Sequence, residues 1–582
     1  MRIEQIATTV GKPCDGVEVI IDGDSEVLIR GYNVMQRSSR RSSSRRLHRP
    51  TVGVKSPIGH SDDEHIPCPY PNFPRLEYGH VVASAVTHIS RSNTAHRSSS
   101  RYPSQVRNAR KILSRPTFEP VVGCAVEIRT RARDAAWRSR TPSQPPPAPG
   151  GTMTDIETKN FFTDPELVED PYPYYDALRE GCPVTREPHH NVMMVTGYEE
   201  AIQVLSDEQT FSSCISVTGP FSGLPACPES DDITDFIEEH RPSLPMNDQL
   251  PTMDPPQHTD HRGLLMRLIT PKRLKENEAF IERIADRLLD DLLARGEGDY
   301  ITGFAAPFAM LVIADLLGVP ESDHQEFIEG LKIQVEKGFS LGSTEGETLK
   351  LNPLEFLYKK FGQYIEDRRA NPTDDVLTGL ATATFPDGTL PPVDDVLRIA
   401  ANVFSAGQET TVRLLSSALR IIAEQPELQK TLRSEPDRIP NFIEETLRFE
   451  SPIKGDFRLA KTPTTVGGVD VSAGTIMMLV NGAANRDPRQ FSDPNEFDID
   501  RRNARTHIAF GRGVHSCPGA PLARTEGRVG IARLLERTSE IRISEKVHGP
   551  EDDRKFGYLP TFILRGLLAL HLEYTPAEGE SK

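Results

Sequence analysis

Long apolar runs are absent from this 582-residue chain. None reaches the length of about 18 residues that a membrane-spanning helix needs, and no apolar segment resembles a secretion signal. The seven cysteines form no evident disulfide framework, which is typical of proteins in a reducing compartment. We therefore expect a cytoplasmic protein without a membrane span.

Nucleotide-binding glycine motifs are also absent. Neither a P-loop nor a Rossmann-type glycine pattern occurs, and no internal repeat is evident. We therefore expect no fused nicotinamide or flavin domain. Any redox reaction of this chain would require electrons from a separate protein.

Composition divides the chain near residue 152. Residues 1–152 carry a net positive charge and are rich in Arg and Ser, whereas the formal net charge of the whole chain is −16. The stretch 141–152 is rich in proline and glycine, as expected of a linker. We expect residues 1–152 to be a basic, Arg/Ser/Pro-rich, disordered extension and residues 153–582 to form the folded domain.

The most informative motif is FGRGVHSCPG at residues 510–519, followed by Leu-Ala-Arg-x-Glu at 522–526. Glycines allow the backbone to approach a flat ligand closely, and the helix predicted at Gly519 places Cys517 at a helix N-terminus. The N–H groups and the dipole there favour a thiolate over a thiol. Haem monooxygenases bind their iron through such a thiolate.

Cys517 could instead be a packing residue or a zinc ligand, but both roles are less favoured. A single cysteine is more often a small buried apolar residue than a metal ligand, yet the fixed spacing of its Phe, Gly and His neighbours argues against coincidence. A zinc site would need a second Cys or His at ligand spacing, and the sequence offers none beside it. Iron ligation by a thiolate is the preferred interpretation.

In this motif the chain resembles the cytochrome P450 superfamily of the soluble bacterial type, and the resemblance extends over residues 153–574. It implies a mainly α fold with small β-sheets, in which haem b lies between a long kinked helix and the cysteine-loop helix. It also implies that Cys517 ligates the iron. Four other loop residues would contact the haem: Phe510, Gly511, His515 and Gly519.

A second motif, AGQETT at residues 406–411, lies within a long helix predicted from 394 to 422. Gly and Thr are unfavourable inside helices, and such exceptions often mark function. In the family that the chain resembles, a kink here opens an oxygen groove and an acid–alcohol pair delivers protons. The groove falls on Ala406 and Gly407, and the pair falls on Glu409 and Thr410. The structural alternative is that the Thr hydroxyl bonds to the carbonyl four residues earlier.

The resemblance assigns two further groups of residues. Glu445, Arg448 and Arg501 would form a structural network behind the cysteine loop, although an acid–base pair at i and i+3 is by itself more often a solvated surface pair. Burying the two haem propionates requires cations or hydrogen-bond donors. The resemblance gives this role to four side chains: His258, Arg262, Arg458 and His515.

Hydrophobic patterning predicts helices at 198–205 and 304–317, and strands within 464–480 and 561–572. By resemblance, the substrate pocket draws on residues 404–406, 452–457, 561–562 and parts of 211–250. These stretches are largely apolar, which suggests an apolar substrate. Lys454 and Asp456 are exceptions that would meet a polar group of the substrate.

The sequence thus predicts a haem-thiolate monooxygenase that inserts one oxygen atom of O2 into a C–H bond of a small, largely apolar substrate. The resemblance implies ferredoxin and ferredoxin reductase as partners, and we expect a monomer without a nucleic-acid partner. One alternative is a peroxide-driven peroxygenase, which has little use for an acid–alcohol pair. The other is a haem-based sensor whose basic extension contacts nucleic acid.

The basic extension itself has two interpretations. Its charge could attract nucleic acid or an anionic membrane surface. Alternatively, the natural protein begins at Met153, whose following residues look like the start of a soluble bacterial P450, and residues 1–152 come from an over-extended reading frame. We favour the second interpretation.

Overall fold

The computed structural model describes residues 17–21, 27–31, 34–36, 158–329 and 354–577. The chain divides into two units, residues 1–143 and 144–582. This division falls inside the Pro/Gly-rich stretch that the sequence indicated as a linker.

The first unit contains a small antiparallel sheet with strand order β1-β2-β3. Its strands are β1 (Val17–Ile21), β2 (Val27–Gly31) and β3 (Val34–Gln36). Composition led us to expect no regular structure in this part of the chain, but Val and Ile recur in these short segments and favour strands. The Arg/Ser-rich runs lie outside the described residues.

Helices predominate in the second unit, as predicted. In chain order they are α3 (Pro165–Glu169), α4 (Tyr172–Gly181), α5 (Tyr198–Leu205), α6 (Thr234–His240), α7 (Gln257–Leu265), α8 (Pro271–Arg295), α9 (Ala306–Leu317), α11 (Glu355–Ala370), α12 (Val376–Ala381), α13 (Val393–Glu424), α14 (Pro426–Ser434), α15 (Ile439–Phe449), α16 (Asn481–Ala484), α17 (Ala520–Arg537) and α18 (Glu545–His548). In the described part of the chain, none of the helices combines the length and the apolar character needed to cross a membrane.

Three small sheets accompany these helices, which confirms the predicted fold class. The largest has the order β4-β5-β11-β8-β6, the second pairs β9 with β10, and the third has the order β12-β13-β7. Only the β5–β11 pairing is parallel in the five-stranded sheet. The strands are β4 (Val184–Arg186), β5 (Met193–Val195), β6 (Phe211–Ser212), β7 (Glu297–Asp299), β8 (Asp456–Ala460), β9 (Thr464–Val466), β10 (Val469–Val471), β11 (Ile476–Leu479), β12 (Thr538–Ile543) and β13 (His571–Pro576).

Some predicted boundaries are correct and one is wrong. The helix predicted at 198–205 is α5, and α9 ends before Gly318, whose φ of 79° suits a residue without a side chain. The strand expected within 561–572 instead begins at His571. The preceding residues make only isolated bridges, Ile453 with Leu564 and Tyr558 with Leu567.

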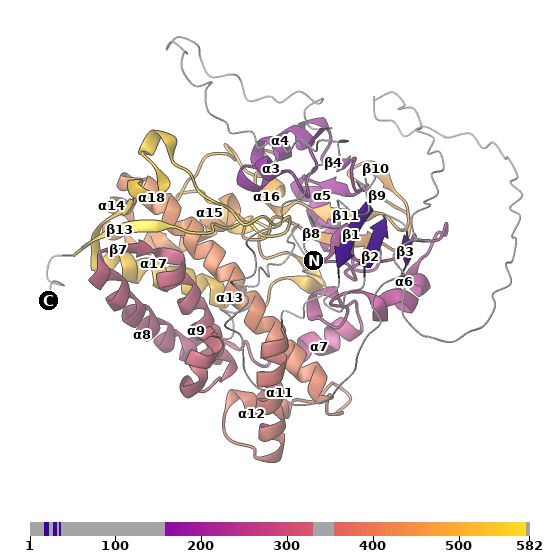
Figure 1. Ribbon diagram of the computed structural model, residues 1–582, viewed down its shortest axis with the longest axis horizontal. Helices are drawn as coiled ribbons and strands as arrows, with labels where there is room; N and C mark the ends of the chain where they lie inside the picture. Colours follow the sequence, from indigo (N-terminus) through magenta and orange to yellow (C-terminus); the bar gives the residue numbers. More distant parts are fainter. Residues whose placement is uncertain (1–16, 22–26, 32–33, 37–157, 330–353, 578–582) are drawn as a thin grey trace, which may run out of the picture. The chain divides into compact units, whose positions relative to one another are not determined.

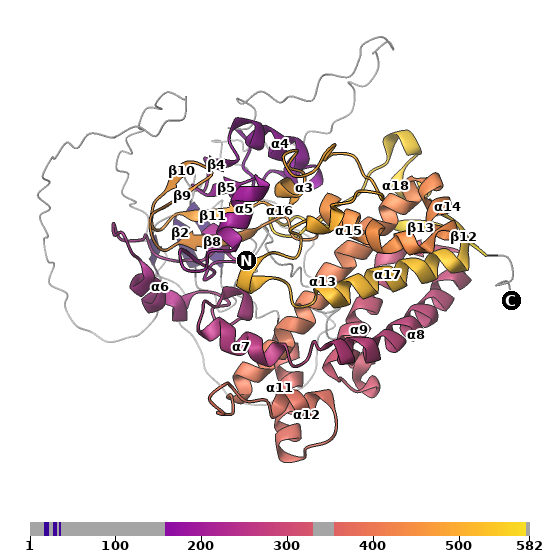
Figure 2. The ribbon, with the colours of Figure 1, turned by 180° about the vertical axis from the view of Figure 1, so that it is seen from behind.

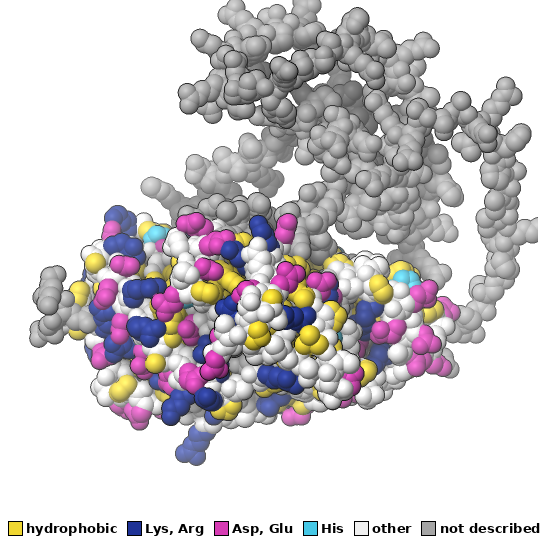
Figure 3. All heavy atoms as spheres, turned by 90° about the horizontal axis from the view of Figure 1, so that it is seen from below, with side chains coloured by type: hydrophobic (Ala, Val, Ile, Leu, Met, Phe, Trp, Pro, Cys, Tyr) yellow, Lys and Arg dark blue, Asp and Glu magenta, His cyan; other side chains and the backbone are white. Residues whose placement is uncertain are grey.

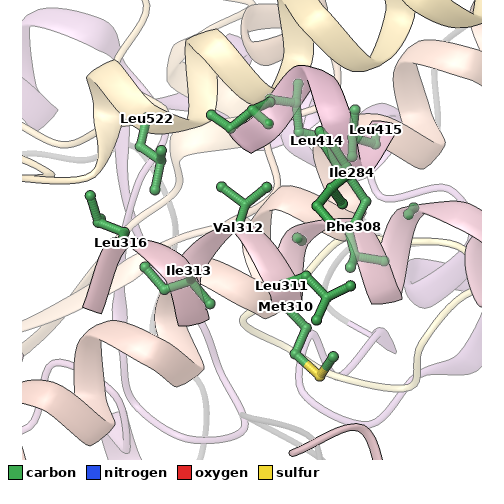
Figure 4. Packing of buried hydrophobic residues seen from close by; sticks show 14 of the residues in the cluster. Ile284, Phe308, Met310, Leu311, Val312, Ile313, Leu316, Leu414, Leu415 and Leu522 are labelled. Carbon is green, nitrogen blue, oxygen red and sulfur yellow. The ribbon is translucent and has the colours of Figure 1, made fainter. Parts of the chain in front are cut away.

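Helix α13 is the longest of the described helices and passes through the second unit (Figures 1 and 2). It packs against α9, α11 and α17. Apolar side chains from three of these helices meet in one core, where α9 contributes Ile313 and Leu316, α13 contributes Leu414 and Leu415, and α17 contributes Leu522 (Figure 4). Because α9 is apolar nearly all round, it is buried on all sides.

The outer face of the second unit has a different character. In the view of Figure 3, basic and acidic side chains alternate over the surface, with small apolar areas between them. The apolar surface is thus concentrated inside, around α9 and α13.

Phe404 lies in this core and not at a pocket, contrary to our prediction. It is fully buried, with its ring centroid 5.2 Å from that of Phe327 and 6.0 Å from that of Phe361. Sequence spacing alone did not show which face of α13 meets α11.

We predict that Phe404→Ala lowers the free energy of unfolding by about 3–5 kcal/mol, because it removes a buried ring and leaves a cavity. Urea denaturation measures this change. Phe404→Leu, which retains most of the apolar volume, should cost clearly less. Equal stability of Phe404→Ala and the unmodified protein would contradict this placement.

Candidate active site

A cavity of about 300 Å³ lies between α13 and the segment formed by the cysteine loop and α17. Side chains of α7, α9, β8 and the neighbouring loops also line it. It collects nearly all the residues that the sequence assigned to a site: His258, Arg262, Ala406, Gly407, Thr410, Arg458, Phe510, Gly511, His515, Cys517 and Gly519. Glu409 is the one predicted catalytic residue that does not line it.

The cysteine loop is shaped by backbone hydrogen bonding and by glycine. The Cys517 N–H donates to the Phe510 carbonyl at 2.8 Å. Gly511 and Gly513 have φ values of 65° and 67°, which side chains disfavour. A Cβ atom at Gly513 would also lie 2.3 Å from the carbonyl oxygen of Leu205. The loop therefore depends on glycine at these points.

Cys517 is surrounded by protein, but its side chain is exposed to the cavity that it lines. Burial raises the pKa of this thiol. The N–H groups of Gly519 and Ala520 and the charge of Arg262 act in the opposite direction but do not outweigh burial. The helix N-terminus thus lowers the pKa of the thiol without offsetting burial, and a bound metal ion would favour the thiolate.

Four nitrogen-bearing side chains lie together at the cavity: His258, Arg262, Arg458 and His515. The two imidazole centroids are 4.0 Å apart. Neither ring nitrogen of His258, nor Nε2 of His515, has a hydrogen-bond partner among the described residues. Burial lowers the pKa of His258 to about 4 and that of His515 to about 2, and the neighbouring arginines add to both effects. Within the described residues, no carboxylate forms an ion pair with any of the four.

The motif on α13 is only partly directed at the cavity. Thr410 lines it, and its hydroxyl donates to the Ala406 carbonyl at 2.8 Å, which is the structural alternative recognised from the sequence. The Glu409 carboxylate accepts a hydrogen bond from Arg413 at 3.3 Å. The alcohol is therefore in place, whereas the acid is held by a cation one turn further along the helix.

Thr411 and Glu526 also line the cavity, although sequence reasoning gave neither a role. The Thr411 hydroxyl donates to Oε2 of Glu526 at 3.1 Å, while Oε1 has no partner among the described residues. Burial raises the pKa of Glu526 well above its usual value. The signal was available, since both residues belong to the two motifs discussed above.

Glu445, Arg448 and Arg501 meet in the interior, where the side chains of Glu445 and Arg448 have no exposed surface. Arg448 donates to both carboxylate oxygens of Glu445 at 2.7 Å, and Arg501 donates to Oε1 at 3.0 Å. Arg448 also donates to the carbonyls of Asn485 and Pro494. A fully hydrogen-bonded pair of this kind is structural rather than a surface pair.

The neighbouring Glu444 forms a second cluster that the sequence did not reveal. Arg524 of α17 donates to both of its oxygens at 2.6 and 3.0 Å, and His507 lies 3.1 Å from Oε2. The Arg524 guanidinium stacks 4.7 Å from the ring centroid of Phe510 in the cysteine loop. Glu444 thus links α15 to α17 and to the loop.

Some of the residues predicted to contact substrate line the cavity, and others do not. Pro452, Ile453 and Asp456 line the cavity, as do Ser216, Val217 and Leu250 from the 211–250 region. Lys454 does not line it, nor do residues 561–562. Lys454 is buried, which lowers its pKa to about 7, and the charge of Arg565 adds to this effect.

The comparisons with known proteins agree with this geometry. A family model for cytochrome P450 matches residues 355–558. Cytochrome P450 144 of Mycobacterium tuberculosis is 32% identical over 433 residues, which cover 72% of this chain and 92% of that protein. The 6-deoxyerythronolide B hydroxylase of Saccharopolyspora erythraea is 33% identical over 393 residues, covering 66% of this chain and 91% of that protein. The chain belongs to the cytochrome P450 family.

Among solved structures, this P450 is similar to cytochrome P450 CYP150A6 of Mycobacterium marinum in its substrate-free form. The two are 53% identical with a TM-score of 0.68, and the match covers 72% of this chain and all of that one. The chain is therefore a haem-dependent monooxygenase of the P450 family, and its cofactor is haem b.

The residues around the cavity fit this cofactor. Haem brings one iron atom and two propionates, and the cavity offers one thiol at Cys517 and a cluster of donors without acidic partners. The unpartnered nitrogens of His258 and His515 are costly to bury unless a ligand accepts from them. The propionates would supply those acceptors.

We predict that Glu444 contributes to stability in a pH-dependent manner. Burial alone would raise its pKa, but hydrogen bonds from His507 and Arg524 and the charge of Arg524 lower it to about 2. The unfolded chain takes up this proton near pH 4.5, so stability from the ionised group is present above that pH and is lost as the pH falls towards 2.

Urea unfolding at pH 7, 5 and 3 tests this prediction. Glu444→Gln should be less stable at pH 7 and should lose about 2 kcal/mol less than the unmodified protein between pH 5 and pH 3. Glu427→Gln, which removes an exposed carboxylate paired only with Lys430, serves as the control. An identical pH dependence in Glu444→Gln and the unmodified protein would contradict the prediction.

Proposed function

We propose that this P450 inserts one oxygen atom of O2 into a C–H bond of a small, largely apolar molecule. The observation that carries the proposal is the position of Cys517, a single thiol that faces a cavity whose remaining wall is mainly apolar. The apolar wall includes Leu250, Ile269 and Val403, and it favours a substrate that gives up little hydration on entry.

Haem, when bound, supplies the oxygen-activating chemistry at its iron. The protein would hold the iron through Cys517 and the propionates through Arg262, Arg458 and the two histidines. The apolar wall excludes water and orients the substrate. We assign Ala406 and Gly407 to the space for dioxygen, because both line the cavity on the same stretch of α13 as Thr410.

Thr410 is the proposed proton-delivering alcohol. Its hydroxyl has one donor, which the Ala406 carbonyl accepts, and its oxygen can still accept a hydrogen bond from the cavity side. Glu409 would resupply the proton from the direction of Arg413, to which it is paired at 3.3 Å. In this proposal Arg413 holds the Glu409 carboxylate until the Glu409 side chain turns towards Thr410.

Electrons would come from a ferredoxin and its reductase. Arg505 lies just before the cysteine loop and Arg512 lies within it; both are exposed, and the side chain of Arg505 is 75% exposed. Cations at such positions suit docking of an acidic redox protein. The described residues comprise no nicotinamide- or flavin-binding glycine motif that could replace such a partner.

A peroxide-driven reaction is the second candidate function. It is favoured by one observation: the Glu409 carboxylate does not line the cavity and is paired with Arg413. Hydrogen peroxide already carries the two protons that the oxygen would otherwise need, so a peroxygenase needs no acid at this position.

Replacement of Thr410 tests the proposal. With a surrogate ferredoxin, its reductase and a substrate identified by its effect on the haem spectrum, Thr410→Ala should continue to consume reductant. We expect its product formed per reductant to fall roughly tenfold or more, because a positioned proton donor is lost. Thr410→Ser retains the hydroxyl and should remain coupled.

Unchanged coupling in Thr410→Ala would remove the assignment of Thr410. Turnover that proceeds with hydrogen peroxide alone, at a rate equal to that with the redox partners and insensitive to the Thr410 substitution, would favour the second candidate.

A further inference from the structure

A ring of contacts behind the cysteine loop has no part in the proposed function. His507 Nδ1 accepts the Ala509 N–H at 3.1 Å, so Nε2 carries the hydrogen and donates to Glu444 at 3.1 Å. Glu444 accepts two further hydrogen bonds from Arg524. The Arg524 guanidinium in turn stacks on Phe510. These contacts lead from the segment before the loop, through α15 and α17, back to the loop itself.

The ring of contacts reaches the proposed iron ligand. The Phe510 carbonyl accepts the Cys517 N–H at 2.8 Å. Burial raises the pKa of the Cys517 thiol, and the charge of Arg524 is one of the causes that oppose this effect. Arg262 is a second cation that acts on the sulfur, but the fit to haem assigns it to a propionate. Arg524 is thus the cation at the sulfur that no part of the haem claims.

Of the two charges in the Arg524–Glu444 pair, the cation is the one that contacts the cysteine loop. Glu444 forms its ion pairs among the described residues with Arg524, with His507 and, at 3.9 Å, with Arg505. None of these three belongs to residues 510–519. The side chain of Glu444 is 9% exposed and that of Arg524 is 27% exposed, so solvent screens both charges only in part.

A positive charge in this place favours the reduced form of a bound haem. One electron converts ferric to ferrous iron and adds one negative charge to the haem and its sulfur ligand. A fixed cation close by stabilises that added charge, and groups behind a metal ligand tune the metal in this way. The electron comes from the redox protein proposed above or, in the test, from dithionite.

We propose that Arg524 sets the reduction potential of the haem iron by holding a positive charge near the Cys517 sulfur, and that Glu444 is its positioning residue. The inference rests on the proposed function, since it requires haem bound through Cys517. Glu444 also reduces the effect of Arg524, because its negative charge partly compensates the positive one. Removing either charge should therefore change the potential, and the two changes should have opposite signs.

The experiment is a potentiometric titration of the haem-loaded full-length protein without substrate. Arg524→Gln removes the positive charge but keeps N–H donors. Glu444→Gln removes the negative charge but keeps an oxygen that accepts from Arg524. Arg528→Gln is the matched control, because Arg528 lies one turn further along α17 and pairs with Glu278 of α8.

We expect Arg524→Gln to lower the equilibrium constant for reduction about tenfold, which is about 59 mV for one electron. Glu444→Gln should raise it by a smaller factor, because the carboxylate is not in contact with the loop. Arg528→Gln should leave it unchanged. A loosened loop would move Arg524→Gln and Glu444→Gln in the same direction, so opposite signs separate a charge effect from a structural one.

The reduced carbon monoxide spectrum of each protein shows whether its haem site is intact. If Arg524→Gln keeps the thiolate band but changes the potential no more than Arg528→Gln, the inference is wrong while the proposed function stands. A fall of the potential in Glu444→Gln also overturns the inference.

If Arg524→Gln loses the band, Glu444→Gln decides: a rise of the potential supports the inference, and no change rejects it. If the unmodified protein gives no thiolate band, the proposed function itself fails.

Discussion

Two adjacent glutamates of α15 hold the segment before the cysteine loop and the first turns of α17, and the loop between them depends on both. Glu445 is buried against Arg448 and Arg501, while Glu444 binds Arg524 of α17 and His507. Removing one partner of a buried ion pair leaves a charge without compensation, at a cost of about 3–5 kcal/mol. The two clusters therefore tie the helix, the loop and the segment before the loop into one arrangement.

This arrangement gives the cavity two chemically distinct parts. One part carries nitrogen donors and a thiol. Burial disfavours the charged forms of His258, His515 and Cys517. A ligand that brings hydrogen-bond acceptors and a metal ion would compensate for this. The other part is formed by apolar side chains of α9 and α13. The first part suits a haem with its propionates, and the second suits an apolar substrate.

Motifs with fixed spacing made much of this site predictable from the sequence. The resemblance that the motifs at 510–519 and 406–411 carry assigned both to one site, and residues of both line the cavity. Side-chain direction was less predictable. Phe404 packs into the core and Glu409 turns to Arg413, since the helix face that meets a neighbour depends on tertiary packing.

The pair of Glu444 with Arg524 was not predictable, because neither motif nor spacing pointed to it. Glu444 and Arg524 are far apart in the chain, and the two adjacent acids of α15 gave no sign of which one would bind Arg524. Lys454 was expected at the pocket because the resemblance assigns residues 452–457 to it, but its side chain is buried away from the cavity. The small sheet within residues 17–36 was missed because composition was averaged over a long, polar segment.

The central claim is that Cys517 ligates haem iron as a thiolate, and a carbon monoxide spectrum tests it most directly. The full-length protein is loaded with haem, reduced and exposed to carbon monoxide, beside Cys517→Ala. The account predicts a red-shifted Soret band typical of a thiolate ligand in the unmodified protein and its loss in the variant. The same band in both proteins, or haem bound without it in the unmodified protein, would contradict the account.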